Sequence, residues 1–175
     1  EALASKGCHV AISDVDGGGL TETESRLKDK YAVTVSSHEL DVADKDQVER
    51  FAADVVREHG KVNMIFNNAG VSLTDTVEHM SYEDFRWLMD INFWGVIYGS
   101  KAFLPYFIDV DEAHVINTSS IFGVIAVPSQ SAYNASKFAV RGFTYAMRQE
   151  LLETNVGVSC VQPGGVKTNI VKSSR

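Results

Sequence analysis

The hydrophobic residues of this chain fall into short apolar runs, separated by longer segments in which apolar positions recur every three or four residues. Each short run ends at Gly, Pro, Asn or Asp, or in hydroxyl residues, and this pattern is typical of strands. The sequence therefore predicts strands over the runs Cys8–Ser13, Tyr31–Leu40, Val62–Phe66, Ala113–Thr118 and Val156–Val161.

The longer segments predict helices, because their apolar stripes have helical spacing and their ends carry capping residues. Asp44 with Gln47 forms a capping-box signature, and Gly60 provides a stop. Ser81 with Asp84 begins a further helix that extends to about Phe107. The expected helices cover Leu20–Lys30, Asp44–Gly60, Ser81–Phe107 and Ser131–Glu153, and Glu1–Gly7 resembles the last turns of another helix.

Strands that alternate with helices favour a parallel sheet covered on both faces. The strand runs are almost continuously apolar, as expected for strands that are buried on both sides. We therefore predict one α/β domain over residues 1–175, with a doubly wound parallel sheet between two helical layers. Ligands of such sheets bind at the carboxyl ends of the strands, where this sequence places polar residues: Asp14, Asp41, Asn68, Ser120 and Pro163-Gly164.

Composition narrows the function further. The net charge is −7 and no Lys/Arg cluster is present, which argues against a nucleic-acid partner and against an anionic membrane surface. No apolar run approaches the length of a membrane span. Cys8 and Cys160 lie in apolar strand-like stretches, so we interpret them as reduced core residues of a cytoplasmic protein. The histidines lack metal-ligand spacing, so no metal site is predicted.

Candidate catalytic chemistry lies between Ser120 and Lys137. Tyr133 and Lys137 are four residues apart and share one face of the predicted helix. A phenol has a pKa of about 10, and a neighbouring ammonium lowers it, so Tyr133 can exchange a proton with an alcohol or carbonyl oxygen. Ser120, at the end of the preceding strand, can hold the same oxygen. A Tyr-x-x-x-Lys pair alone also arises by chance in a chain with six tyrosines.

Two other strand ends each have a binding and a structural interpretation. Asp14 can accept both hydroxyls of an adenosine ribose and repel a 2′-phosphate, or it can simply form the turn before the glycines, and Asp16 competes for either role. Asp41-Val42 can contact an adenine edge, or can be a polar strand terminus.

The remaining candidates are equally open at this point. Asn68-Ala69-Gly70 lets the backbone approach a ligand closely, or forms a plain turn. Asn92 can bond a backbone carbonyl and hold a water near Lys137, or it can be a satisfied polar residue between helices. The loop after the last strand can hold a carboxamide through Val166 and Thr168, or it can be an ordinary Pro163-Gly164 turn.

Taken together, these ordered motifs resemble the short-chain dehydrogenase/reductase family over essentially the whole chain. The resemblance implies a Rossmann-like fold and a catalytic set of Asn92, Ser120, Tyr133 and Lys137. It implies that Tyr133 is the acid/base, that Ser120 orients the substrate oxygen, and that Lys137 binds the nicotinamide ribose and lowers the pKa of Tyr133. Asn92 would support a water-linked proton path.

The resemblance also assigns the cofactor contacts. Asp14 matches the acidic residue that favours NAD over NADP, and Asp41-Val42 matches the adenine contact. Asn68-Ala69-Gly70 matches a structural motif of the family. The nicotinamide loop matches Pro163, Gly164, Val166 and Thr168.

Two departures from the family pattern stand out. The family's first strand and its Gly-rich phosphate loop have no counterpart here, and neither does the segment that covers the substrate. The absent strand would lie between the runs Cys8–Ser13 and Val62–Phe66, so we expect a gap of one strand there, with unpaired backbone groups. We expect these residues to form part of a larger enzyme.

The predicted function is hydride transfer between NAD, with NADP less favoured, and an alcohol or ketone. The apolar segment Ile121–Pro128 points to an apolar small-molecule substrate. By likeness to the family, we expect a homodimer or homotetramer. Two alternatives remain: a dinucleotide-binding regulator without chemistry, and a nucleotide-sugar epimerase.

Overall fold

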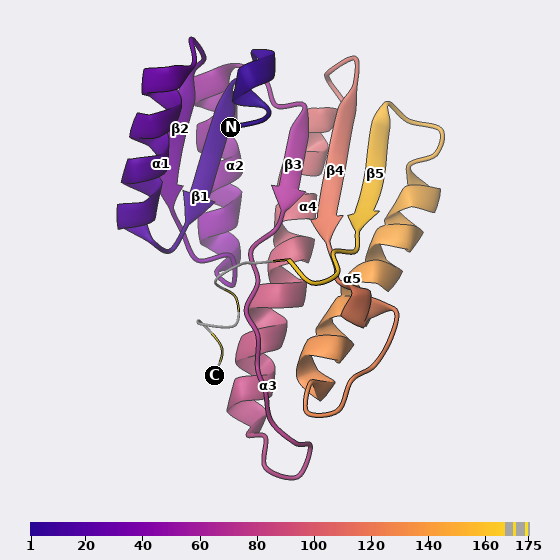
Figure 1. Ribbon diagram of the computed structural model, residues 1–175. Helices are drawn as coiled ribbons and strands as arrows, with labels where there is room; N and C mark the ends of the chain where they lie inside the picture. The colour runs from indigo at the N-terminus through magenta and orange to yellow at the C-terminus, as the bar shows by residue number, and fades with distance from the viewer. Residues whose placement is uncertain (167–169, 171–173, 175) are drawn as a thin grey trace.

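The computed structural model describes residues 1–166, 170 and 174. Within them, parallel strands alternate with helices (Figure 1). The strands are β1 (Val10–Asp14), β2 (Val35–Glu39), β3 (Met64–Asn67), β4 (Ala113–Thr118) and β5 (Val156–Val161). The α-helices are α1 (Gly17–Lys30), α2 (Lys45–His59), α3 (Tyr82–Met89), α4 (Gly95–Phe107) and α5 (Ser131–Glu150). A π-helical turn, Asp90–Trp94, joins α3 to α4, and short 3-10 turns cover Ala4–Lys6 and Ile121–Gly123.

The sheet consists of two parallel parts. β1 pairs with β2, whereas β3, β4 and β5 form a second part in which β4 is central. In the described chain, no backbone pairing joins β1 to β3, although Figure 1 shows the two strands running in the same direction. All carboxyl ends of the strands therefore point to one edge of the molecule, as the sequence predicted.

Helices cover both faces of this sheet. Consecutive strand residues point to opposite faces, and Val10 packs in one hydrophobic cluster whereas Ala11 packs against another. The Val10 cluster contains Leu27 of α1. The Ala11 cluster forms the main core and draws buried residues from α2, α4, α5, β4 and β5: Ala52, Val55, Phe103, Phe107, Ala113, Val115, Met147, Val156 and Val158. The predicted three-layer α/β/α architecture is confirmed.

Most helix ends follow the capping signals in the sequence. The Asp44 side chain accepts a hydrogen bond from the Gln47 backbone at the start of α2, and Gly60 ends that helix with φ 78°. Ser81 caps α3 by accepting from the Asp84 backbone. Gly7 adopts φ 85° after its 3-10 turn, a conformation that favours glycine.

One helix begins earlier than the pattern predicted. α1 starts at Gly17 rather than Leu20, because the Asp16 side chain accepts a hydrogen bond from the Gly19 backbone and caps a first turn made of glycines. α5 ends at Glu150, slightly before the predicted Glu153.

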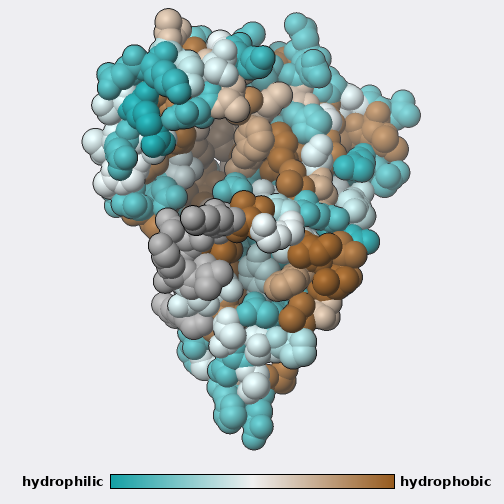
Figure 2. All heavy atoms as spheres, in the orientation of Figure 1, coloured by the Kyte–Doolittle hydropathy of each residue, from teal (hydrophilic) through white to brown (hydrophobic). Residues whose placement is uncertain are grey.

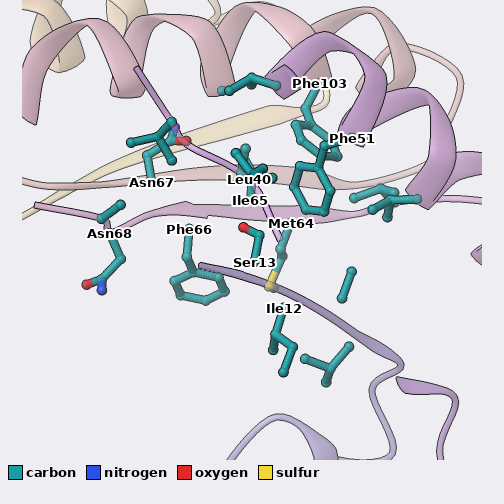
Figure 3. A pocket seen from close by; sticks show the side chains of 18 of the residues that line it. Ile12, Ser13, Leu40, Phe51, Met64, Ile65, Phe66, Asn67, Asn68 and Phe103 are labelled. Carbon is teal, nitrogen blue, oxygen red and sulfur yellow. The ribbon is translucent and has the colours of Figure 1, made fainter. Parts of the chain in front are cut away.

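A groove separates β1 from β3, with a volume of about 660 Å³. Figure 3 shows Met64 and Phe66 of β3 beside Ile12 and Ser13 of β1, all lining this groove. Met64 and Phe66 are each 51% exposed, although both lie in a strand of the sheet. The groove lies where the resemblance predicts a further strand, so the expected gap is present.

The two cysteines were expected to be reduced core residues. Both cysteines are free, as predicted, but Cys8 is exposed, so the interpretation of both as core residues is wrong for Cys8. Its position before β1 leaves it outside the packed part of that strand.

None of the helices in the described residues combines the length and the apolar character that a membrane span requires.

Candidate active site

Tyr133 lies in the first turn of α5, facing the end of β4. The nearby Ser120 hydroxyl acts to lower the pKa of its phenol. Ser120 is buried, and its Oγ also accepts a hydrogen bond of 3.1 Å from the Phe122 backbone N–H. The Phe122 ring meets the Tyr133 ring edge-on, with 6.0 Å between centroids. The predicted convergence of the serine hydroxyl and the phenol is therefore present.

Lys137 lies one turn further along α5 and is 3% exposed. Its ammonium donates a hydrogen bond of 3.0 Å to the Thr118 carbonyl at the end of β4. The Nζ atom lies 5.6 Å from the centroid of the Tyr133 ring. Burial lowers the pKa of Lys137 to about 8, and the nearby Cys160 opposes this shift.

The prediction that Lys137 lowers the pKa of Tyr133 is wrong for this geometry. Burial raises the pKa of Tyr133 above its ordinary value, and only the hydrogen bond with Ser120 lowers it. The physical reason is that burial of the phenol is the largest effect on its pKa, while the Lys137 ammonium bonds to the Thr118 carbonyl. Tyr133 is therefore a protonated phenol at neutral pH.

Asn92 occupies the π-helical turn and is completely buried. Its Oδ1 accepts from the Val71 backbone N–H at 2.8 Å, and its Nδ2 donates to the Val71 carbonyl at 2.9 Å. The same Nδ2 donates to the Ser136 hydroxyl at 3.2 Å. Asn92 therefore bonds a backbone carbonyl, which both interpretations of this residue allow. These contacts hold the segment after β3 against α5, next to Tyr133.

The turn after β3 contacts both Asn92 and Lys137. A Cβ atom on Gly70 would stand 3.2 Å from Asn92 Oδ1 and 3.5 Å from Lys137 Nζ, so a side chain at this position would crowd both groups. The Asn68 Oδ1 accepts a hydrogen bond of 3.3 Å from the Thr118 hydroxyl. Asn68 and Ala69 line the carboxyl end of the groove.

Asp14 ends β1 with an exposed carboxylate. Its Oδ1 accepts a hydrogen bond of 3.1 Å from the Asp16 backbone. Asp16, the competing candidate, uses its carboxylate to cap α1. The geometry therefore favours Asp14 over Asp16 as the carboxylate that faces a ligand.

Asp41 and Val42 follow β2 in a tight turn. The Asp41 Oδ1 accepts a hydrogen bond of 2.9 Å from the Ala43 backbone, and the Asp41 N–H donates to Gln47 Oε1 at 3.1 Å. Val42 packs against Gly95, where an added Cβ would stand 2.9 Å from Val42 Cγ2. This turn therefore lies beside the start of α4.

The loop after β5 is tied to the end of β4. The Ser119 backbone N–H donates to the Val161 carbonyl at 2.8 Å, and the Ile121 N–H donates to the Pro163 carbonyl at 2.9 Å. These bonds place Pro163 and the following Gly164 beside Ser120. Val166 is 62% exposed. Thr168 lies outside the described residues.

The groove between β1 and β3 is distinct from this catalytic cluster. It reaches Asp14, Val42, Asn68 and Ala69 at the carboxyl ends of the strands, but most of its lining comes from the strand edges. Ser120, Tyr133 and Lys137 do not line it. The size of the groove therefore reflects the division of the sheet, whereas the substrate site has to be sought beside Ser120.

Two positioning residues were not predicted from the sequence. The Ser136 hydroxyl donates to the Tyr133 carbonyl at 2.8 Å while it accepts from Asn92. The Ser119 hydroxyl donates to the Lys137 carbonyl at 2.7 Å. Serine is common near helix starts and strand ends, so the sequence carries no signal for these contacts with residues that are distant along the chain.

Comparison with known proteins agrees with this geometry. The family model described as short chain dehydrogenase matches residues 1–175. The chain belongs to the short-chain dehydrogenase family. A relative from Mycobacterium tuberculosis, named "Putative oxidoreductase SadH", is 46% identical over 174 residues, and this match covers 98% of the present chain. The chain spans 63% of the length of that curated relative.

Solved structures of the short-chain dehydrogenase family superimpose closely. A short-chain dehydrogenase/reductase from Burkholderia phymatum in complex with NAD gives a TM-score of 0.94 at 34% identity, covering 97% of this chain and 61% of the other. An alcohol dehydrogenase from the archaeon Thermococcus sibiricus complexed with 5-hydroxy-NADP gives a TM-score of 0.92 at 26% sequence identity. This match covers 99% of the present chain and 72% of the other. The Rossmann-like fold is therefore shown.

Proposed function

We propose that this short-chain dehydrogenase interconverts an alcohol and a ketone with a nicotinamide dinucleotide, and that it favours NAD. One observation carries the proposal: the Tyr133 phenol lies close enough to the Ser120 hydroxyl at the end of β4 for that hydroxyl to lower its pKa, with the buried Lys137 one turn away. A hydroxyl and a phenol that meet in this way form a site for one substrate oxygen.

The described residues fit such a cofactor. Lys137, with its ammonium beside Gly70, can donate hydrogen bonds to the hydroxyls of a nicotinamide ribose. Asp14 presents an exposed carboxylate to the hydroxyls of an adenosine ribose, and Asp41-Val42 offers the adenine contact. Asn68, Ala69 and Gly70 would line the cofactor path, and Pro163, Gly164 and Val166 would hold the nicotinamide, as Thr168 would by likeness to the family. When bound, the nicotinamide accepts or supplies the hydride.

In the proposed chemistry, Ser120 donates a hydrogen bond to the substrate oxygen and fixes its position. In ketone reduction, the Tyr133 phenol gives its proton to the carbonyl oxygen. In alcohol oxidation, the same oxygen atom of Tyr133 takes the proton from the substrate hydroxyl. The raised pKa of Tyr133 supports its role as a proton donor at neutral pH. Asn92 would act by holding the Val71 backbone and α5 in place around Tyr133 and Lys137.

The proposed substrate is apolar. Ile121, Val124 and Ile125, in the loop directly after Ser120, are 38%, 41% and 51% exposed. Figure 2 shows hydrophobic surface gathered over this part of the molecule. An uncharged alcohol or ketone with apolar substituents can cover these side chains when its oxygen reaches Ser120 and Tyr133.

We also propose a homodimer or homotetramer formed through α4 and α5, in the cytoplasm. Trp94, just before α4, is 43% exposed, and Phe138 and Tyr145 of α5 are each 42% exposed. Large aromatic side chains on a helix surface are typical anchors of protein interfaces.

The decisive experiment assays the protein at its natural length with NAD and with NADP against secondary alcohols and ketones of increasing apolar size. We expect turnover with NAD and a preference for apolar substrates. Absence of turnover and of dinucleotide binding with every cofactor and substrate pair would refute the proposed function.

A further inference from the structure

The loop of residues 121–128, which follows Ser120, lies against α5, the helix that carries Tyr133. Figure 1 shows the 3-10 turn at the start of this loop beside α5. Gly123, the last residue of the turn, is buried, and an added Cβ there would stand 2.7 Å from the Lys137 carbonyl oxygen. The backbone of the loop therefore approaches the backbone of the helix closely, one turn after Tyr133.

Two side chains of α5 bond to the backbone of this loop. The Arg141 Nη1 donates a hydrogen bond of 3.0 Å to the Gly123 carbonyl. The Asn134 Nδ2 donates one of 3.1 Å to the Val127 carbonyl. In the part of the chain that the structure describes, no backbone N–H donates to either carbonyl, so the two side chains satisfy them. Asn134 and Arg141 are spaced so that they share one face of the helix.

The two bonds hold the loop near both of its ends. Gly123 lies just after Ser120, and Val127 lies shortly before Tyr133. Ser120 is itself linked to the turn, because its Oγ accepts from the Phe122 N–H and its carbonyl accepts from the Gly123 N–H. A shift of the turn along α5 would therefore change the distance between the Ser120 hydroxyl and the Tyr133 phenol.

Asn134 is 6% exposed, and its Oδ1 has no hydrogen-bond partner among the residues with described positions. A buried oxygen without a partner is unfavourable, whereas the Nδ2 of the same amide holds the Val127 carbonyl. A leucine at this position would remove the unpaired oxygen together with the donor. The gain and the loss offset each other, so Asn134→Leu should lose the contact with the loop at little cost in global stability.

We infer that Arg141 and Asn134 are positioning residues, which hold the loop 121–128 on α5. In this way they set the place of the Ser120 hydroxyl, and the inference therefore rests on the proposed function, in which that hydroxyl holds the substrate oxygen. Exposed apolar side chains lie between the two bonded carbonyls, so the same bonds shape the surface that an apolar substrate covers.

The test uses the protein at its natural length. Arg141→Met and Asn134→Leu each remove one donor to the loop, whereas Arg141→Lys keeps the charge and an N–H donor. Arg148→Met is the matched control, because Arg148 and Arg141 both lie over the Tyr145 ring. Arg148 donates to the Val158 carbonyl of β5 at 2.9 Å and not to the loop. The control therefore removes an arginine bonded to a backbone carbonyl elsewhere on the same helix.

Three quantities are measured: amide hydrogen exchange across the loop 121–128, kcat/KM for an apolar secondary alcohol, and the affinity for NAD. We expect Arg141→Met and Asn134→Leu each to speed exchange of the loop about tenfold and to lower kcat/KM about tenfold. NAD affinity should stay within about twofold, whereas a general loss of structure would weaken it as well. Arg141→Lys should recover part of both losses, and the control should change none of the three quantities by more than about twofold.

Two results would overturn the inference. One is exchange across the loop that is no faster in Arg141→Met and Asn134→Leu than in the control. The other is faster exchange with kcat/KM unchanged, because the loop would then not position the reacting groups.

Failure of the proposed function looks different, because hydrogen exchange needs no substrate. If the unaltered protein turned over no alcohol or ketone, the proposed chemistry would fail, and with it the positioning of Ser120 for that chemistry. Faster exchange in both variants than in the control would still show that Arg141 and Asn134 hold the loop on α5.

Discussion

The Asn92 amide donates a hydrogen bond of 3.2 Å to the hydroxyl of Ser136, and both side chains are completely buried. The Ser136 hydroxyl donates its one hydrogen bond to the Tyr133 carbonyl, so it has to accept the hydrogen bond from Asn92. This relationship fixes the orientation of the Asn92 amide, because its Oδ1 is then turned to the Val71 N–H. A buried serine thus connects the π-helical turn with the start of α5.

Replacing Ser136 with Ala is the first prediction. The loss leaves the Asn92 amide and the Tyr133 carbonyl each short of one buried hydrogen bond, which costs about 1–3 kcal/mol of unfolding free energy. Urea denaturation measures this change. The control is Ser25→Ala, which removes an exposed hydroxyl bonded to Asp29 and should change stability by less than about 0.5 kcal/mol. Equal effects of the two substitutions would show that the buried contacts carry no stability.

Replacing Tyr133 with Phe is the second prediction, and it separates an enzyme from a dinucleotide-binding regulator. Removal of the phenol oxygen should lower kcat by a factor of about 10²–10⁴, because the proton donor is lost. Dinucleotide affinity should change little, since the ring that packs on Phe122 is retained. Steady-state rates and NAD titration measure the two quantities. Unchanged turnover in the variant would exclude Tyr133 as the acid/base.

Replacing Lys137 with Met is the third prediction. The folded-state pKa of Lys137 is about 8, against 10.5 without the fold, so below pH 8 the folded protein bears the full cost of burying this charge. The substitution should raise the free energy of unfolding at pH 7 by up to about 3 kcal/mol and abolish turnover.

The pH dependence of this stability difference provides its check. Between pH 8 and 10.5 the unfolded chain keeps a proton on Lys137 that the folded protein has lost, so the stability of the unaltered protein rises relative to the Met variant. The gain from the substitution should therefore shrink across this range. A gain that stays constant with pH would point to packing rather than to charge burial.

The two directions of the reaction should depend on pH in opposite ways. Since burial raises the pKa of Tyr133, its phenol is protonated at neutral pH. Ketone reduction needs this proton, so its rate should hold at neutral pH and fall only at alkaline pH above the ordinary pKa of a phenol. Alcohol oxidation needs the phenolate and should become faster over the same rise. Initial rates in both directions from neutral to strongly alkaline pH test this, and parallel profiles would contradict it.

The groove leads to the last prediction. Among the described residues, no strand lies between the facing edges of β1 and β3, and Met64 and Phe66 are exposed there. Unpaired backbone groups and exposed apolar side chains lower stability. We expect the 175-residue polypeptide to melt without a sharp transition and to bind NAD weakly. The matched comparison is a chimera in which these residues replace the corresponding part of the mycobacterial relative, which should melt cooperatively and bind NAD more tightly.

The sequence predicted the fold well where local signals determine it. The five described strands and the helices between them follow from apolar runs and from caps such as Asp44, Ser81 and Gly60. The start of α1 was missed because three glycines disfavour a helix, whereas the Asp16 cap and packing of the later turns outweigh that preference. The π-helical turn at Asn92 has no local sequence signal, because tertiary contacts with Val71 and Ser136 stabilise it.

For the candidate site, the sequence identified residue positions better than their electrostatics. Ser120, Tyr133 and Lys137 come together because the end of a strand and the start of the next helix meet at the sheet edge. The pKa of Tyr133 was predicted in the wrong direction, because spacing along a helix does not reveal the burial of the phenol.

The division of the sheet also means that remote packing sets the geometry of dinucleotide recognition. Asp14 belongs to the β1–β2 part, whereas Lys137 packs on the β3–β5 part, and an edge-to-face contact of 5.7 Å between Phe51 of α2 and Phe103 of α4 helps to hold the two parts together. Replacing either ring with a smaller side chain should therefore change the distance between Asp14 and Lys137, the two residues proposed to face the ribose groups, without removing any proposed ligand contact.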